Sequence, residues 1–406
     1  MAHHRACSRR DAHALAIAAL LTAACSGSQD SSATSSNGFG GDGASTGSSN
    51  SESATSGTVG SAGSSGDPSG SGGSGGSNGS GGAVLADWCA TGDSALAKVA
   101  QALPPRTWQR MPDSPSLDAL DMESSLLYWA DSASWDPATR RVRWVGGPGT
   151  CCANPAVYQR IEYDVAADEW TMTATPFEGS GHAYDANTID PGSSFLYFAK
   201  FHDEEVRRFD GQSWTSLPAL PLDPQAAVGL TWFPELDGGA GGLVYVNGNG
   251  EVARFDGNAW TLVEGAEAAP WGTYNVFAEY NPTHGLVWLG GGNEAETTSY
   301  LLDGQATLTH LGDAPVSLNV GRTLHMADPV SGNYVVFERE LGAWWELDPI
   351  ADAWTEITDM QSAPDFASSQ EWSSVIQVPV PECGVILFLS HYHEYRNVYV
   401  YRHGAL

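Results

Sequence analysis

Two short stretches near the middle of the chain are nearly identical. Residues 208–214 read RFDGQSW and residues 254–260 read RFDGNAW. In each copy an Asp-Gly pair separates two β-rich runs, and the second run opens with tryptophan. This pattern is typical of a hairpin with a tight turn. The chain is therefore expected to be built from repeated hairpins.

Three weaker copies extend the repeat along the chain. Asp164 precedes Trp170, Asp348 precedes Trp354, and Thr307 stands where the tryptophan would be expected after Asp303. Successive copies are 44 to 47 residues apart, which is the period of a four-stranded propeller blade. The repeat thus predicts an all-β propeller.

Each repeat also contains an upstream hairpin with proline in its turn, where a fixed φ is favourable and no N–H is needed. A strongly apolar strand follows each turn. The six turns contain Pro137, Pro191, Pro234, Pro282, Pro329 and Pro381. The number of copies predicts six blades.

The last repeat ends without its outer strand. Residues 106–112, RTWQRMP, read as an outer strand with no hairpin before it. We therefore expect this N-terminal strand to complete the sixth blade and close the ring, which leaves no open sheet edge.

The N-terminal part of the chain has a different composition. Residues 1–25 contain three arginines, an apolar run and Cys25, and read as an export signal that is too short to span a membrane. Residues 26–83 are almost wholly small and polar, which predicts a disordered tether. The propeller is expected to occupy residues 84–406.

Residues 21–25, LTAAC, resemble a bacterial lipobox. The resemblance implies that Cys25 is lipidated and that the exported protein is anchored to the outer membrane, at the cell surface or in the periplasm, by lipid alone. The alternative is an ordinary cleaved signal with an incidental cysteine.

The chain is strongly acidic, with 48 Asp and Glu against 18 Lys and Arg. Such a charge repels phosphate backbones, so nucleic-acid binding is not expected. The simplest explanation of the acidity is the solubility of an exported protein.

Several motifs resemble those of bacterial kelch-like propellers, the group that includes the central domain of galactose oxidase. Gly146-Gly147 and Gly290-Gly291 follow apolar strands, and Arg322 and His325 precede an Asp-Pro turn. The resemblance implies a propeller that serves most often as a binding scaffold and in a few cases as an enzyme.

The cysteines provide a geometric test of the propeller. Cys383 lies in a hairpin loop of the sixth blade and Cys89 precedes the closing strand of that blade, so both are expected on one face and to form a disulfide. Cys151 and Cys152 are expected on the opposite face, either as a vicinal disulfide or as free or metal-binding thiols.

Propeller ligands usually bind where the innermost strands begin, about nine residues before each hairpin proline. The residues near these positions are Trp129, His182, Gln225, Trp271, Arg322 and Trp372. Three tryptophans around one opening could stack on a sugar or a peptide. Alternatively, they could wedge between neighbouring blades.

His391 and His393 alternate on one strand and could hold a metal together with His182 or His202. The alternative is a solvated polar loop. No phosphate loop, serine-nucleophile elbow or zinc-protease signature is present, so no cofactor is expected apart from such a metal.

The sequence therefore predicts a monomeric, envelope-anchored propeller that binds a carbohydrate or a protein. A secreted metal-dependent enzyme, such as an oxidase, lyase or glycosidase, is the first alternative. An inert structural spacer is the second.

Overall fold

The computed structural model describes residues 87–122, 124–127, 129–131, 133–147, 156–179, 183–224, 227–265, 272–293, 296–360, 363–364, 366, 375–392 and 395–405. The chain divides into two units, Met1–Ser80 and Gly81–Leu406. All the described residues belong to the second unit. Among them, no helix is both long enough and apolar enough to cross a bilayer.

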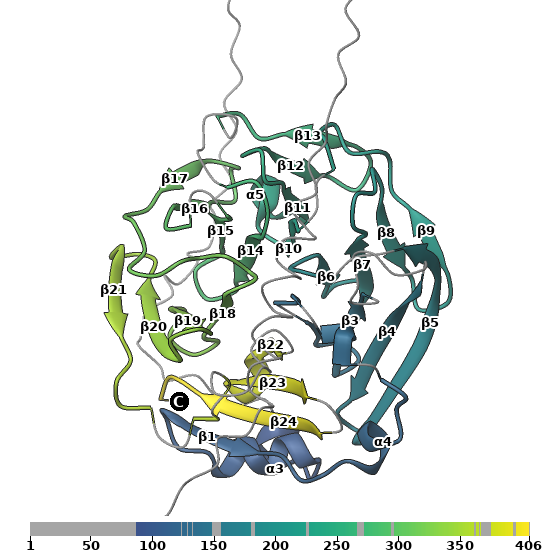
Figure 1. Cartoon of the computed structure of the whole chain (residues 1–406), viewed down its shortest axis with the longest axis vertical. Helices are drawn as coiled ribbons and strands as arrows, with labels where there is room; N and C mark the ends of the chain where they lie inside the picture. Colours follow the sequence, from purple (N-terminus) through teal and green to yellow (C-terminus); the bar gives the residue numbers. More distant parts are fainter. Residues whose placement is uncertain are drawn as a thin grey trace, which may run out of the picture. The chain divides into compact units, whose positions relative to one another are not determined.

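Six four-stranded antiparallel sheets are arranged in a ring (Figure 1). The predicted six-bladed β-propeller is therefore confirmed. In blades 1 to 5 the strands follow one another in sequence from the centre outwards, so each blade is a simple meander.

The strands of the first three blades are β2 (Ser134–Asp136), β3 (Arg141–Gly146), β4 (Ala156–Asp164) and β5 (Glu169–Gly179); β6 (Asn187–Asp190), β7 (Phe195–Ala199), β8 (Val206–Phe209) and β9 (Trp214–Ser216); β10 (Gly229–Phe233), β11 (Gly242–Val246), β12 (Val252–Phe255) and β13 (Trp260–Leu262).

The strands of the last three blades are β14 (Val276–Asn281), β15 (Leu286–Gly291), β16 (Ser299–Leu302) and β17 (Leu308–His310); β18 (Thr323–Ala327), β19 (Tyr334–Glu338), β20 (Ala343–Asp348) and β21 (Ala353–Glu356); β22 (Val375–Val380), β23 (Val385–Tyr392), β24 (Tyr395–Arg402) and β1 (Thr107–Arg110). The helices are short and connect or flank the blades: α2 (Asp87–Thr91), α3 (Ala95–Ala102), α4 (Pro115–Asp118), η1 (Ser124–Leu127), α5 (Leu236–Gly239) and η4 (Pro381–Cys383).

The ring closes as the sequence predicts. β1 pairs antiparallel with β24, from Thr107 opposite Arg402 to Arg110 opposite Tyr399, and the two strands lie side by side in Figure 1. The ring of Trp108 stacks on Tyr401 with centroids 4.5 Å apart. The two ends of the domain thus share one sheet.

A disulfide reinforces this closure. Cys89 in α2 and Cys383 in η4 are joined by an S–S bond and are fully buried, which is the pairing expected from the sequence. Cys25, Cys151 and Cys152 lie outside the described residues.

The repeated Asp-Gly turns are held by the same local hydrogen bonds in both copies. Asp210 accepts the backbone N–H groups of Gln212 and Ser213 at 2.8 and 2.7 Å, and these bonds lower the pKa of its carboxyl. Asp256 makes the equivalent contacts in the next blade. Because the turn is stabilised locally, it fixes the register of the outer strands.

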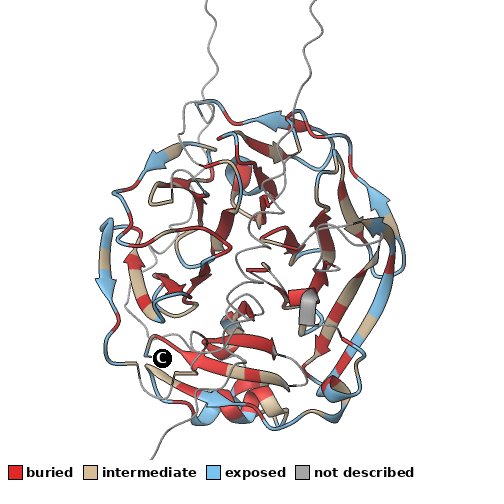
Figure 2. Ribbon diagram, viewed as in Figure 1, coloured by how far each residue is buried: buried red, intermediate tan, exposed pale blue. Residues whose placement is uncertain are grey.

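The apolar core lies between neighbouring blades. Five clusters of buried side chains fill the interfaces between sheets, and Figure 2 shows buried residues along the inner strands and exposed ones along the rim. The buried polar groups described below lie at the innermost strands. The architecture therefore surrounds a polar centre with apolar walls.

Candidate functional site

A cavity of about 360 Å³ opens at the end of the central channel where the innermost strands enter their proline turns. Innermost strands of blades 1, 2, 3, 4 and 6 contribute to its wall. The prolines that line it are Pro137, Pro191, Pro234, Pro282, Pro379 and Pro381. We call this space the proline-end cavity.

Three half-buried aromatic rings line the proline-end cavity, each two residues before a hairpin proline. They are Trp135, Trp232 and Tyr280. Trp135 donates its indole N–H to Glu382 at 2.7 Å, and Tyr280 donates its hydroxyl to Glu235 at 3.0 Å. These bonds hold two of the rings in defined positions. Hydrogen-bonding side chains lie between the rings and are contributed by Ser134, Asn187, Thr188 and Thr231.

The lining of the cavity includes Glu279 of β14, which also belongs to a cluster of three carboxylates. One oxygen from each of Asp131, Asp185 and Glu279 lies within 4.8 Å of the others. Asp131 and Asp185 are fully buried, and Glu279 is 7% exposed. These side chains come from blades 1, 2 and 4, and we call them the carboxylate cluster.

Hydrogen bonds to the innermost strands fix two members of the cluster. Asp131 lies 2.6 Å from Nδ1 of His325 and accepts that residue's backbone N–H at 3.1 Å. Asp185 accepts the backbone N–H of Ala278 at 2.6 Å. The first contact joins blades 1 and 5, and the second joins blades 2 and 4. The carboxylates therefore tie the blades together across the channel.

The electrostatics of the cluster are unfavourable for three free negative charges. Burial raises the pKa of Glu279 well above its ordinary value, and the nearby Asp185 and Asp131 raise it further, while a hydrogen bond from Gln377 opposes the shift. Burial lowers the pKa of Arg339 to about 10, against the attraction of Asp131. Three buried carboxylates this close are stabilised by a proton on one of them or by a nearby cation.

Two members of the predicted ring of binding residues, Trp129 and Arg322, lie in the described part of the chain. A Cβ at Gly321 would lie 2.6 Å from the ring of Trp129, so this indole covers the backbone that leads into blade 5. Arg322 lies 3.6 Å from both Glu296 and Glu340. The other predicted members lie outside the described residues: His182, Gln225, Trp271 and Trp372.

The structure places the predicted metal-binding histidines as follows. His391 is buried near the end of β23, opposite Arg396 of β24. His202 is exposed in the loop between β7 and β8 and packs on Phe201, with ring centroids 4.4 Å apart. His393 lies outside the described residues. Within the described part of the chain, the one group of three metal-ligating side chains is the carboxylate cluster.

Sequence reasoning overlooked the carboxylate cluster, although a partial signal was present. Asp131 and Asp185 both stand six residues before the hairpin proline of their blade, and Glu279 stands three before its own. The candidate positions taken about nine residues before each hairpin proline therefore did not include any of the three carboxylates. A search for charged residues on strands that must be buried would have found Glu279 within a β-rich run.

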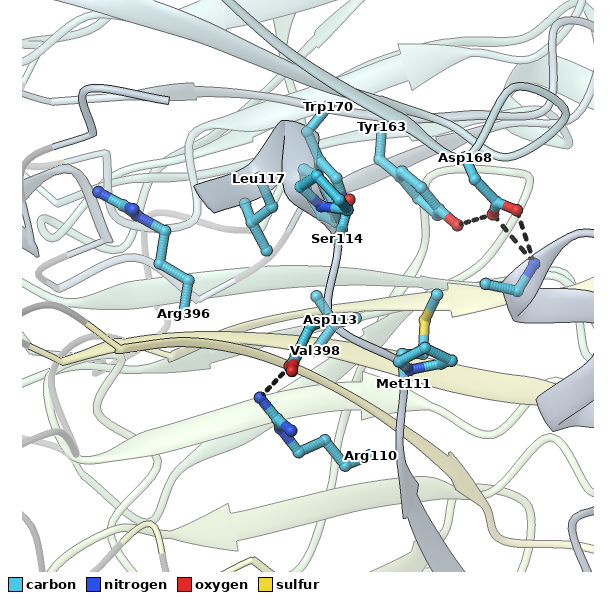
Figure 3. Close-up of a pocket in the computed structure, with 13 residues that line it drawn as sticks. Arg110, Met111, Asp113, Ser114, Leu117, Tyr163, Asp168, Trp170, Arg396 and Val398 are labelled. Carbon is cyan, nitrogen blue, oxygen red and sulfur yellow. Dashed lines mark hydrogen bonds and ion pairs between the residues drawn. The ribbon is translucent and has the colours of Figure 1, made fainter. Parts of the chain in front are cut away.

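A second cavity, of about 240 Å³, lies on the outside of the ring at the seam between blades 6 and 1 (Figure 3). Several of its polar groups already have partners. Tyr163 donates to Asp168 at 2.8 Å, and Arg110 contacts Asp113 at 2.5 Å. Asp168 also accepts the N–H of Ala95 at the start of α3. We regard this cavity as part of the ring closure.

No protein-family model and no curated protein matches the sequence. Solved structures similar to this chain include virginiamycin B lyase from Staphylococcus aureus, at a TM-score of 0.47 and 12% identity over 72% of this chain and 98% of that chain. An auxiliary nutrient binding protein from Bacteroides thetaiotaomicron is similar at a TM-score of 0.44 and 11% identity, over 67% of this chain and 69% of that chain. A chain of a nidogen/laminin complex is similar at a TM-score of 0.40 and 11% identity, over 55% of this chain and 78% of that chain. At these levels the similarities support no inference about function.

Proposed function

We propose that this protein is an envelope-anchored, kelch-like binding propeller that takes a saccharide-sized ligand into the proline-end cavity. The observation that carries the proposal is the placement of aromatic rings from three blades around one cavity. A volume of about 360 Å³ falls in the range usual for small-molecule sites.

The chemistry of the lining favours a carbohydrate. The faces of Trp135, Trp232 and Tyr280 offer apolar surfaces on which a sugar ring can stack, and the hydroxyl groups of Ser134 and Thr231 in the same lining can bond to sugar hydroxyls. Glu279 and Glu382 add two acceptors.

The proposed location follows from the N-terminal sequence. Lipidation of Cys25 would anchor the chain, and residues 26–83 would act as a tether with a root-mean-square reach of about 40 Å. A buried disulfide between Cys89 and Cys383 is compatible with an oxidising compartment outside the cytoplasm.

A glycan array followed by calorimetric titration of the strongest ligand tests the proposal. We expect Trp232→Ala to weaken binding by roughly 10-fold or more, because loss of a stacking indole typically costs over 1 kcal/mol. Trp214→Ala is the matched control, since Trp214 is a half-buried tryptophan in the outer strand β9, and it should leave the affinity within about 2-fold.

Two results would count against carbohydrate binding at this cavity. One is the absence of any glycan signal from folded wild-type protein. The other is an affinity that Trp232→Ala and Trp135→Ala leave unchanged, which would place the ligand elsewhere, for example at the opposite mouth near Trp129.

A further inference from the structure

We propose that the carboxylate cluster is a binding site for one divalent cation, with Ca²⁺ preferred. Its ligands would be carboxylate oxygens of Asp131, Asp185 and Glu279, together with the side-chain carbonyl of Gln377. This inference does not depend on whether the proline-end cavity binds a carbohydrate.

The first support is the geometry of the cluster. The three carboxylate oxygens lie within 4.8 Å of one another. Oxygens that bind one Ca²⁺ at 2.3–2.6 Å are separated by at most about 5 Å. The three side chains could therefore reach a common cation with little movement. Ca²⁺ accepts irregular geometry and binds carboxylate and amide oxygens directly, whereas Mg²⁺ requires near-ideal octahedral geometry and gives up its waters reluctantly. A buried set of side-chain oxygens therefore suits Ca²⁺ better.

The second support is independent of the acidic side chains. Gln377 of β22 is fully buried, and its Oε1 accepts no hydrogen bond. Its amide nitrogen donates to the backbone carbonyl of His325 at 2.5 Å, and the side chain also bonds to Glu279. The unpartnered carbonyl oxygen therefore belongs to an amide that lies against the cluster. A buried acceptor without a donor is costly unless a cation or a water satisfies it.

The third support is the state of Glu279. Its Oε1 is buried and accepts no hydrogen bond, and no basic side chain in the described part of the chain forms an ion pair with it. His325 and the buried guanidinium of Arg339 both interact with Asp131. A divalent cation would balance the remaining charge and supply the missing partner of the Glu279 Oε1 atom.

The ligand set and its access decide which metal fits. The four side chains provide only oxygen donors, which suit Ca²⁺, Mg²⁺ or Mn²⁺ and disfavour the softer transition metals. Because Glu279 also lines the proline-end cavity, a cation could enter from that side. Water in the cavity could fill its remaining coordination positions.

Calorimetric titration of CaCl₂ into the EDTA-treated, dialysed full chain, prepared without a polyhistidine tag, tests the proposal. We expect one Ca²⁺ per chain, weaker binding of MgCl₂, and a melting temperature that rises with Ca²⁺. Glu279→Gln should weaken Ca²⁺ binding by roughly 100-fold and Gln377→Met by roughly 10-fold.

Glu235→Gln is the matched control, because it removes the same charge from a carboxylate that lies outside the cluster. It should leave Ca²⁺ affinity within about 2-fold. Removing one of three mutually repelling carboxylates relieves repulsion, so Glu279→Gln is expected to fold. Folding of both variants is checked by circular dichroism.

Failure of folded wild-type protein to bind Ca²⁺, Mg²⁺ or Mn²⁺ at millimolar concentration would overturn the proposal, and this titration needs no variant. An affinity equal in wild type and Glu279→Gln would also overturn it, because the cation would then bind elsewhere.

Discussion

Glu346 of β20 lies 3.2 Å from Nε2 of His403, the first residue after the last strand. Its other carboxylate oxygen lies 3.1 Å from the guanidinium of Arg106, the residue before β1. One carboxylate of blade 5 therefore contacts both chain segments that close the ring. The bond with His403 is the main cause that lowers the pKa of Glu346 to about 2, and Asn333 and Arg106 contribute.

We expect this carboxylate to make ring closure sensitive to acid. The folded-state pKa is lower than the ordinary value of 4.5, so the stabilisation is fully present above pH 4.5 and is lost as the pH falls toward 2. Glu346→Gln should lower the free energy of unfolding by about 1–3 kcal/mol at pH 7. The difference should shrink markedly at pH 3. Urea unfolding at the two pH values measures it.

Glu356→Gln provides the control, because Glu356 is exposed at the end of β21. This change should alter stability by less than about 0.5 kcal/mol. If Glu346→Gln cost as much at pH 3 as at pH 7, the role of Glu346 would be packing and not charge.

The disulfide is expected to stabilise the same closure. The bond between Cys89 and Cys383 spans 294 residues, and constraining so long a loop restricts the unfolded chain strongly. The double variant Cys89→Ala/Cys383→Ala should lose about 2–5 kcal/mol in the free energy of unfolding. Guanidinium unfolding without reductant measures this loss.

Reductant provides an internal control for the disulfide. Wild type should approach the stability of the double variant once the bond is reduced, while the variant itself should change little. Identical unfolding midpoints of the two oxidised proteins would show that the bond contributes nothing to equilibrium stability.

The fold could be predicted because its signals are local. The turn at Asp210 is held by backbone N–H groups two and three residues ahead, so its sequence is sufficient to identify the hairpin. The closing strand at Trp108 could be inferred because the last blade lacked an outer strand, and an open edge is unfavourable. The hairpin can be inferred from neighbouring residues alone, and the closing strand can be inferred from the number of strands in each repeat.

The site could not be predicted in the same way. Asp131, Asp185 and Glu279 belong to three blades, and they occupy different positions relative to the hairpin prolines. Their proximity depends on the diameter of the channel and on which strand face points inward, and neither is encoded locally. The binding role predicted for Trp129 remains a prediction; in the structure its ring lies against Gly321.

Two glycines separate the effect of backbone conformation from that of close packing. Gly211 has φ +94° and a Cβ there would meet nothing within 4 Å, whereas Gly291 has φ +70° and a Cβ would lie 2.0 Å from the carbonyl oxygen of Leu318. Gly211→Ala should therefore cost about 1 kcal/mol. Gly291→Ala must move the backbone of the segment that connects blade 4 to blade 5, so it should cost more than about 3 kcal/mol.

Thermal unfolding of the two variants tests this difference, with Gly257→Ala as the repeat control. Gly257 has φ +96° and the same open surroundings as Gly211, so the two substitutions should lower the melting temperature equally. If Gly291→Ala lowered the melting temperature no more than Gly211→Ala and Gly257→Ala do, the backbone around Gly291 would have room to move apart. The double glycine of β15 would then reflect backbone conformation alone, and not the close approach of the connecting segment at Leu318.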